Sequence, residues 1–205
     1  SLQKNHRAIC VEFDKLTSRL FIGNADETIS VYDLAGDLLI TLDGHEGGVR
    51  ALTYDPYHSL LYSASFDHTV GVWKIPPPGH EKEIVRQCVL HYHMEPVNAI
   101  VMCPSLQGFV SGSSDCSILR INHKDLEGLK GHIRGSEGDS IHARALHRDH
   151  GEETRQDIPV IGVSDAHESG LRSLTWSDKT QVLASIANEN EIRFWSFGEQ
   201  KGKDG

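Results

Sequence analysis

The sequence of 205 residues lacks the features that mark several large classes of protein. No apolar run in it approaches the roughly 18 consecutive residues that cross a membrane, and we therefore expect no membrane span. Its 20 Lys and Arg residues are outnumbered by 29 Asp and Glu residues, and the net charge of −9 argues against a nucleic-acid partner, which needs a basic surface. A hydrophobic fraction of 38% with 24% charged residues is typical of a globular chain and not of a disordered one.

Paired cysteines are missing as well. The four cysteines, Cys10, Cys88, Cys103 and Cys116, form no C-x-x-C motif. Since a chain of this length can bury a core without disulfides, reduced thiols are the better interpretation, with two disulfides as the alternative. Reduced thiols favour an intracellular protein, and we expect the cytoplasm, with the nucleus as the alternative.

The common signatures of enzymes are also absent. Neither a phosphate-binding loop, G-x-x-x-x-G-K-[ST], nor a nucleophile elbow, G-x-S-x-G, occurs in the chain. His142, His147 and His150 stand near carboxylates, a combination that suits zinc, but spacings of five and three residues match no known ligand pattern. We therefore predict no catalytic residue, no metal and no cofactor. An enzyme would require this histidine-rich stretch to hold a metal ion.

What the sequence does contain is a repeat, visible as short segments rich in β-branched and aromatic residues. Four of these segments occupy residues 29–32, 70–73, 118–121 and 192–195. Each follows an acidic residue, and these residues are separated by 41, 48 and 74 positions: Asp26, Asp67, Asp115 and Glu189. Apolar positions recur in the same order within each period, with turn residues between them, which indicates strands. We expect no helix.

Each period has room for four strands. In the second unit we expect strands at residues 49–54, 60–63, 69–74 and 84–90. One four-stranded antiparallel sheet cannot bury both of its faces, whereas sheets stacked around an axis can. The predicted fold class is therefore all-β: a β-propeller of four-stranded antiparallel blades, with about four blades present.

The second unit carries a motif that resembles the WD-repeat family: Gly44-His45, then Ser63, Asp67 and Trp73. In that family the His, Ser, Asp and Trp side chains form a buried hydrogen-bonded network inside each blade. The resemblance implies that Asp67 accepts from the His45 ring, that His45 meets the Ser63 hydroxyl, and that Ser63 meets the Trp73 indole N–H. Every buried polar group would then have a partner.

The other units match the motif less completely. The matching residues are His93, Ser111 and Asp115 in the third unit, and His167, Ser185, Glu189 and Trp195 in the fourth. Ile121 stands in the tryptophan column of the third unit, and the first unit keeps only Asp26. We expect a complete network in one blade, a partial network in two blades and none in the first.

The repeat assigns residues 1–205 to one partial WD-repeat propeller with four units. These units span about residues 4–42, 44–90, 92–163 and 166–197. The last unit has three strands, and in the family an N-terminal strand closes the ring against such a blade. We therefore expect the C-terminal part of a seven-bladed ring, completed by upstream residues or by another chain. A complete four-bladed ring is the alternative.

Two stretches fall outside the repeat. The long third period places an insertion at residues 122–157, which we interpret as a flexible loop because charges, Gly and His dominate it. Residues 198–205 are expected to form a polar tail.

The resemblance also implies where partners bind. In the family they meet side chains just before and within the first strand of each blade, and the residue before the turn Asp. Carried over by position, the candidates are Arg7, Arg50, Phe66, Asn98, Arg172 and Asn188. The Arg residues would face an acidic peptide or a phosphate, and Phe66 would be the apolar anchor. We expect a non-enzymatic scaffold whose partners are other proteins or peptides.

Two further functions are alternatives: the substrate receptor of a ubiquitin ligase, and a phosphoinositide-binding propeller. Some such receptors carry Asp after the blade Trp, but Lys74 follows Trp73 here and Ser196 follows Trp195. The Phe-Arg-Arg-Gly motif of the phosphoinositide-binding subgroup does not occur. The scaffold function is favoured, although the fold alone does not decide it.

Overall fold

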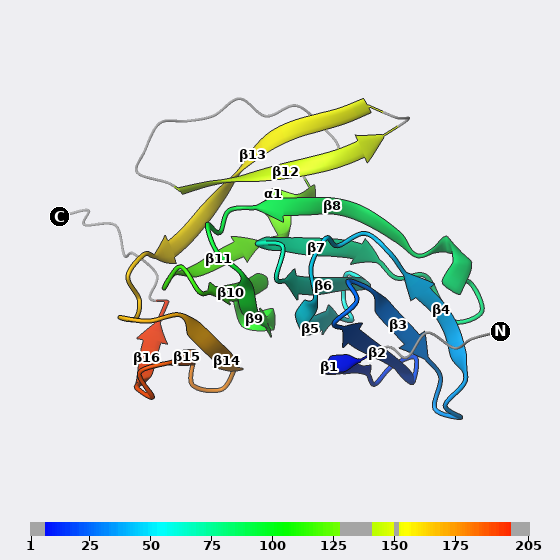
Figure 1. Ribbon diagram of the computed structural model, residues 1–205, viewed down its shortest axis with the longest axis horizontal. Helices are drawn as coiled ribbons and strands as arrows, with labels where there is room; N and C mark the ends of the chain where they lie inside the picture. Colours follow the sequence, from blue (N-terminus) through cyan, green and yellow to red (C-terminus); the bar gives the residue numbers. More distant parts are fainter. Residues whose placement is uncertain (1–6, 128–140, 150–151, 198–205) are drawn as a thin grey trace.

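The computed structural model describes residues 7–127, 141–149 and 152–197, and almost all regular structure in these ranges is β (Figure 1). The first sheet has the order β1-β2-β3-β4, with bounds β1 (Ala8–Asp14), β2 (Arg19–Asn24), β3 (Ile29–Tyr32) and β4 (Leu38–Leu42). The second unit holds β5 (Val49–Asp55), β6 (Leu60–Ser65), β7 (Thr69–Lys74) and β8 (Val85–His91). Their bounds differ from the predicted strands by at most two residues.

The later units continue the pattern. The third unit holds β9 (Val97–Cys103), β10 (Gly108–Ser113) and β11 (Ile118–Asn122), and the fourth holds β14 (Leu171–Ser177), β15 (Val182–Ala187) and β16 (Ile192–Ser196). Neighbouring strands within each unit pair antiparallel. The predicted all-β architecture of antiparallel propeller blades is confirmed, and Figure 1 shows the sheets arranged as a fan.

The stretch 122–157 differs from the expected loop. A hairpin of β12 (Ile141–Asp149) and β13 (Glu152–Val163) occupies much of it. β12 pairs with β8, and the end of β13 pairs with β11 as the fourth strand of the third unit. The second and third units thus share one nine-stranded sheet. The physical reason is that β8 and β11 would otherwise present unpaired backbone groups at an edge, and the hairpin pairs with both.

The expectation of no helix is also wrong at one place. A short helix, α1 (His123–Glu127), follows β11, and two single 3₁₀ turns, η1 (Glu81–Glu83) and η2 (Pro104–Leu106), lie in connections. Among the described residues no helix is long and apolar enough to cross a membrane.

Three apolar cores lie between successive sheets. Phe21, Val49 and Trp73 belong to the core between the first and second units, and Tyr62 and Phe109 belong to the core between the second and third units. A third core, which includes Leu171 and Leu183, joins the third unit to the fourth. All six residues of β6 and of β10 are buried, because these strands have a neighbouring sheet on both faces.

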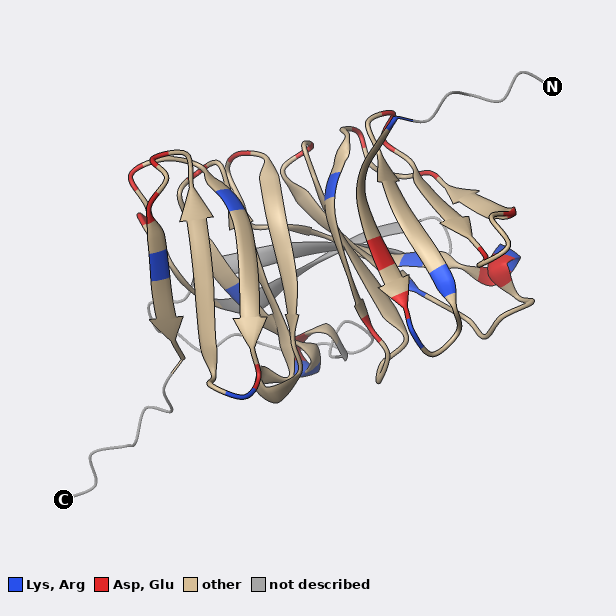
Figure 2. Ribbon diagram, turned by 90° about the horizontal axis from the view of Figure 1, so that it is seen from below, with Lys and Arg blue, Asp and Glu red and all other residues tan. Residues whose placement is uncertain are grey.

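The two end sheets each leave apolar side chains exposed. Val11 and Phe13 of β1 are 62% and 41% exposed, and Ile192 and Phe194 of β16 are 60% and 72% exposed. Figure 2 shows the strands of the end sheets from the side, with acidic residues in the loops along the edge where β1 begins.

Replacing Phe109 tests the packing between blades. The Phe109 side chain is fully buried and its ring centroid lies 4.4 Å from that of Tyr62, so Phe109→Ala should lower the free energy of unfolding by about 3–5 kcal/mol. Phe194→Ala, at an exposed position, should change it by less than about 0.5 kcal/mol. Urea unfolding followed by tryptophan fluorescence measures both. Equal losses in the two variants would contradict the assignment of the core.

Candidate functional site

A buried hydrogen-bonded network links the loop before β5 to β6, to the β6–β7 turn and to β7. His45 Nδ1 lies 2.8 Å from Asp67 Oδ2, and His45 Nε2 lies 2.6 Å from Ser63 Oγ. The Trp73 indole N–H donates to Ser63 Oγ at 2.8 Å. Because a carboxylate only accepts, Nδ1 carries the proton and Nε2 accepts from the Ser63 hydroxyl. The structure thus brings together the four residues that the WD motif suggested.

Asp67 is the most heavily bonded member of this network. It also accepts the backbone N–H of Glu46 at 2.9 Å, and the backbone N–H and hydroxyl of Thr69 at 3.0 and 2.6 Å. Partial burial raises the pKa of Asp67, but the hydrogen bond from His45, followed by those from the Thr69 and Glu46 donors, outweighs this effect. They hold the pKa of Asp67 well below its usual range.

The third blade completes the same network with a different residue. His93 Nδ1 lies 3.1 Å from Asp115 Oδ2, and its Nε2 lies 2.9 Å from Ser111 Oγ. Ile121 supplies no indole, but the Tyr92 hydroxyl lies 2.9 Å from Ser111 Oγ and fills that role. The sequence reasoning missed Tyr92. The available signal was a hydroxyl-bearing aromatic residue directly before the network histidine.

In the fourth blade, glutamate takes the position of aspartate. His167 Nδ1 lies 2.6 Å from Glu189 Oε1, and His167 Nε2 lies 2.7 Å from Ser185 Oγ. The Trp195 indole N–H donates to Ser185 Oγ at 2.8 Å. All four chemical roles of the motif are therefore occupied in this blade.

The first blade has no histidine in its network but is not without polar bonds. The Asn24 amide donates to Thr28 Oγ1 at 3.0 Å and to Ser30 Oγ at 2.9 Å, and the Thr28 hydroxyl donates to Asp26 Oδ1 at 2.8 Å. Asn24, Thr28 and Ser30 are all buried. A smaller network thus connects the turn carboxylate to the strands in this blade.

Every first strand of a blade carries a β-bulge near its start. Pairing with the second strand skips one residue in each case, namely Ile9 in β1, Arg50 in β5, Asn98 in β9 and Arg172 in β14. A bulge bends the strand and re-aims the extra side chain, and bulges recur next to binding sites. Three of the six partner-binding candidates stand at these bulges.

A repeated backbone bond places the remaining candidates at the same edge. The N–H of the residue before the turn carboxylate donates to a carbonyl just before the first strand. The pairs are Ala25 to Arg7 at 2.8 Å, Phe66 to Gly48 at 3.0 Å, Ser114 to Pro96 at 2.9 Å and Asn188 to Gly170 at 3.2 Å. We refer to the edge defined by these bonds and the four bulges as the bulged edge.

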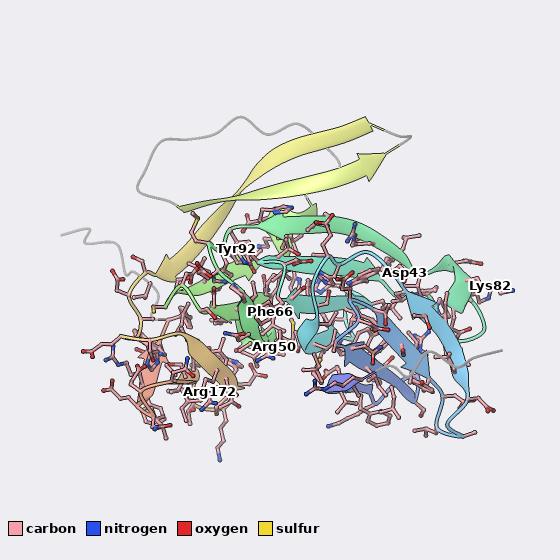
Figure 3. All side chains as sticks on the ribbon, viewed as in Figure 1. Asp43, Arg50, Phe66, Lys82, Tyr92 and Arg172 are labelled. Carbon is pink, nitrogen blue, oxygen red and sulfur yellow. The ribbon has the colours of Figure 1, made fainter. Side chains whose placement is uncertain are left out.

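Arg50 and Phe66 form the most definite contact on the bulged edge. The Arg50 guanidinium carbon lies 5.8 Å from the centroid of the Phe66 ring, within cation–π range, and Phe66 is 54% exposed. Figure 3 shows the two side by side, with Arg172 further along the same side of the fan. A charged donor beside an exposed ring is the composition of an interface anchor.

The other candidates are placed differently. The Asn98 amide donates to Ser114 Oγ and to the Leu171 carbonyl, both at 2.8 Å, so it ties the third blade to the fourth. Arg7, Arg172 and Asn188 are exposed. Asn98 is therefore a structural clamp in this arrangement, and the exposed surface consists of the other five residues.

Cysteine offers no activated nucleophile at this edge or elsewhere. All four cysteines are free thiols. Burial raises the pKa of Cys10 to about 11 and the pKa of Cys88 and Cys103 to about 12. A thiol with a raised pKa is a poor nucleophile at neutral pH. The histidine group His142, His147 and His150 lies outside the residues whose side chains the structure describes.

Comparison with known proteins agrees with the geometry. The family model "WD domain, G-beta repeat" matches residues 36–74, which contain the whole network of the second blade. "WD repeat and FYVE domain-containing protein 2" of Homo sapiens is 38% identical over 68 residues, covering 32% of this chain and 17% of the relative. "WD repeat and FYVE domain-containing protein 1" of Mus musculus is 31% identical over 114 residues, covering 54% and 27%.

A longer alignment connects the chain to a third relative. The "Ribosome biogenesis protein WDR12 homolog" of Anopheles gambiae is 22% identical over 181 residues, which is 87% of this chain and 39% of the relative. The chain spans well under half the length of each of these relatives. The motif, the blades and these matches agree that residues 36–74 form a WD repeat and that the chain is similar to WD-repeat proteins.

Removing Ser63 tests the energetic role of the network. Ser63→Ala leaves the His45 ring nitrogen and the Trp73 indole N–H buried without their shared partner, so the free energy of unfolding should fall by about 1–3 kcal/mol. Ser196→Ala, on an exposed position of β16, is the matched control and should change it by less than about 0.5 kcal/mol. Chemical denaturation compares the two. A loss in Ser63→Ala no larger than the control would refute the role.

The lowered pKa of Asp67 predicts a sensitivity to acid. A carboxyl whose pKa is lower in the folded state adds stability above its unfolded value, near pH 4, and this stability is lost as the pH falls toward the folded value. Asp67→Asn should therefore be destabilised at pH 7 but should lose less further stability than the wild type between pH 5 and pH 2. Urea midpoints across this range measure the difference. Parallel curves for the two proteins would contradict the prediction.

Proposed function

We propose that this protein is a non-enzymatic scaffold that binds a protein or peptide segment across its bulged edge. The observation that carries the proposal is the repetition of the bulge at Arg50 and Arg172, combined with the contact between Arg50 and Phe66. Because the bulge recurs in separate blades, several side chains are held in fixed positions along the same edge of a rigid structure. Binding that depends on pre-positioned side chains loses little conformational entropy.

The charge of this edge restricts the partner. Arg50 and Arg172 suit a carboxylate, and Phe66 suits an apolar side chain next to it. The loops of the same edge carry the exposed acidic residues Glu27, Glu46 and Glu168, which would repel a uniformly acidic chain. The partner segment is therefore proposed to combine an acidic and an apolar residue with basic residues in its flanks, so that repulsion contributes to specificity.

The narrower alternatives have less support. The names of the relatives mention FYVE domains and ribosome biogenesis and point to no common partner. A role as ubiquitin-ligase substrate receptor and a role in phosphoinositide binding stay alternatives to the scaffold. The cytoplasm, with the nucleus as the alternative, stays the proposed location, and four free thiols fit a reducing compartment.

A peptide-display selection tests the proposal. Peptides selected on the wild type should be enriched in an acidic residue next to an apolar one, and the Arg50→Ala/Phe66→Ala variant should bind them at least about tenfold more weakly. The matched control is Lys15→Ala/Leu16→Ala, which removes an exposed cation and an exposed apolar residue from the β1–β2 turn at the other edge. It should bind as the wild type does. Selected peptides that bind both variants equally would sink the proposal.

A further inference from the structure

A second cluster of polar side chains lies at the edge opposite the bulges, where it plays no part in the proposed binding surface. Asp55 ends β5, His58 lies in the β5–β6 turn, and His123 begins α1 in the third unit. His58 Nδ1 lies 2.5 Å from Asp55 Oδ2, and His123 Nε2 lies 3.1 Å from the same oxygen. One ligand atom from each residue lies within 4.8 Å of the others. Two imidazoles therefore converge on one carboxylate oxygen.

The turn itself holds the Asp55 carboxylate in this orientation. Asp55 Oδ1 accepts the backbone N–H of Tyr57 at 2.9 Å and the backbone N–H of His58 at 3.3 Å. Oδ1 is thus used by the turn, and Oδ2 is directed at the histidines. The Asp55 side chain is fully buried and that of His123 is 4% exposed, whereas that of His58 is 41% exposed. Two of the three groups are fixed, and the third can adjust.

A hydrogen bond at its second ring nitrogen also fixes the orientation of the His123 ring. The Tyr62 hydroxyl lies 2.9 Å from His123 Nδ1, which leaves Nε2 facing Asp55. A metal-bound histidine usually makes a hydrogen bond through its other ring nitrogen, and Tyr62 is placed to be that partner.

The corresponding turn of the first blade shows that the fold does not need the histidines. Asp14 occupies the place of Asp55 and likewise accepts two backbone N–H groups, from Leu16 and Thr17. Its other oxygen meets the Thr17 hydroxyl and, at 3.9 Å, the Arg19 guanidinium. A hydroxyl and a cation suffice for the turn. The pair of imidazoles in the second blade is therefore an addition that the turn does not explain.

A cavity gives access to the cluster. It has a volume of about 460 Å³ and is lined by Asp55, His58 and His123 together with Met102, Gln107 and Lys124 among others. An ion bound by the three side chains would keep one coordination position open toward this cavity. Lys124 would disfavour a second cation there but would accommodate water or a small anion in the open position.

We propose that Asp55, His58 and His123 form a zinc site that joins the second blade to the third. Imidazole nitrogen and carboxylate oxygen are common zinc ligands, and three protein ligands with one open position is a frequent arrangement. Tetrahedral zinc with ordinary bond lengths separates its ligand atoms by about 3.4 Å. The distance from His123 to Asp55 is already close to this value, and the partly exposed His58 ring has to move outward. Zinc binds imidazole through a nitrogen that carries no proton, so in the zinc-bound state His58 and His123 each keep their N–H on the ring nitrogen that faces away from the ion.

Zinc titration of the full chain after chelator treatment tests the proposal. Isothermal titration calorimetry should show one Zn²⁺ per chain, and His58→Ala should weaken its binding by roughly 100-fold or more, since loss of an outer-shell partner alone costs about 10–100-fold. His58 is partly exposed, so this variant should stay folded. Tyr62→Phe should weaken binding by about tenfold while leaving the three ligands in place. Visible absorption of bound Co²⁺ should report tetrahedral coordination in the wild type.

Two control variants make the outcomes separable. His80→Ala removes an exposed histidine that pairs with Glu83 and should bind zinc as the wild type does. His142→Ala/His147→Ala/His150→Ala removes the histidine-rich stretch and should also leave binding unchanged. Zinc binding that survives His58→Ala and His123→Gln, or that disappears only with the triple variant, would overturn the proposal. No zinc binding by the wild type would overturn it as well.

Discussion

Each sheet of this molecule is apolar on both faces, and only another sheet can cover a face of that size. This constraint determines the rest of the architecture. Cores form between successive sheets, as the packing of Phe109 against Tyr62 illustrates. Backbone pairing also occupies the outer strand edges of the second and third units, because the hairpin of β12 and β13 connects β8 to β11. Since packing takes up sheet faces and backbone pairing takes up strand edges, the loops and turns at the two ends of the strands are the places for functional side chains.

The hydrogen-bonded networks make one of these ends rigid. Asp67 accepts hydrogen bonds from His45 and from the backbone N–H groups of Glu46 and Thr69, which fixes the β6–β7 turn. Phe66 directly precedes Asp67 in this turn. Because every buried polar group in this network has a partner, the turn is held in one conformation. Phe66 and the neighbouring Arg50 are thus presented from a fixed backbone, which is what a binding surface requires. The opposite end is built from turns in which a carboxylate such as Asp55 accepts backbone N–H groups, and there the second blade adds histidines.

Local pattern predicted the fold well, and the contacts it missed are those between residues far apart in the sequence or outside the motif. Strand bounds in the second unit follow from the alternation of apolar residues and turns, which is a local property. The motif did not predict the contact of Tyr92 because this residue stands at a different position of the repeat from the usual tryptophan. Its hydroxyl nevertheless reaches Ser111 Oγ, the atom that a tryptophan indole would contact. For residues 122–157 the many charges and glycines predicted a loop, although the hairpin of β12 and β13 occupies much of this stretch. The approach of His123 to Asp55 depends on the packing of two blades, which no spacing within one repeat can show. The number of blades in the ring and its closure stay predictions.

The central claim is that the bulged edge binds a peptide that combines an acidic and an apolar residue. The most direct measurement is mapping of backbone amide chemical shifts while such a peptide is titrated into the isotope-labelled protein. The account predicts that the largest changes fall on residues 48–50, on Phe66 and on residues 170–172, where the bulges and the turn residues meet. Changes concentrated on the Asp55 turn and on α1, or spread evenly over the exposed faces of the end sheets, would contradict it.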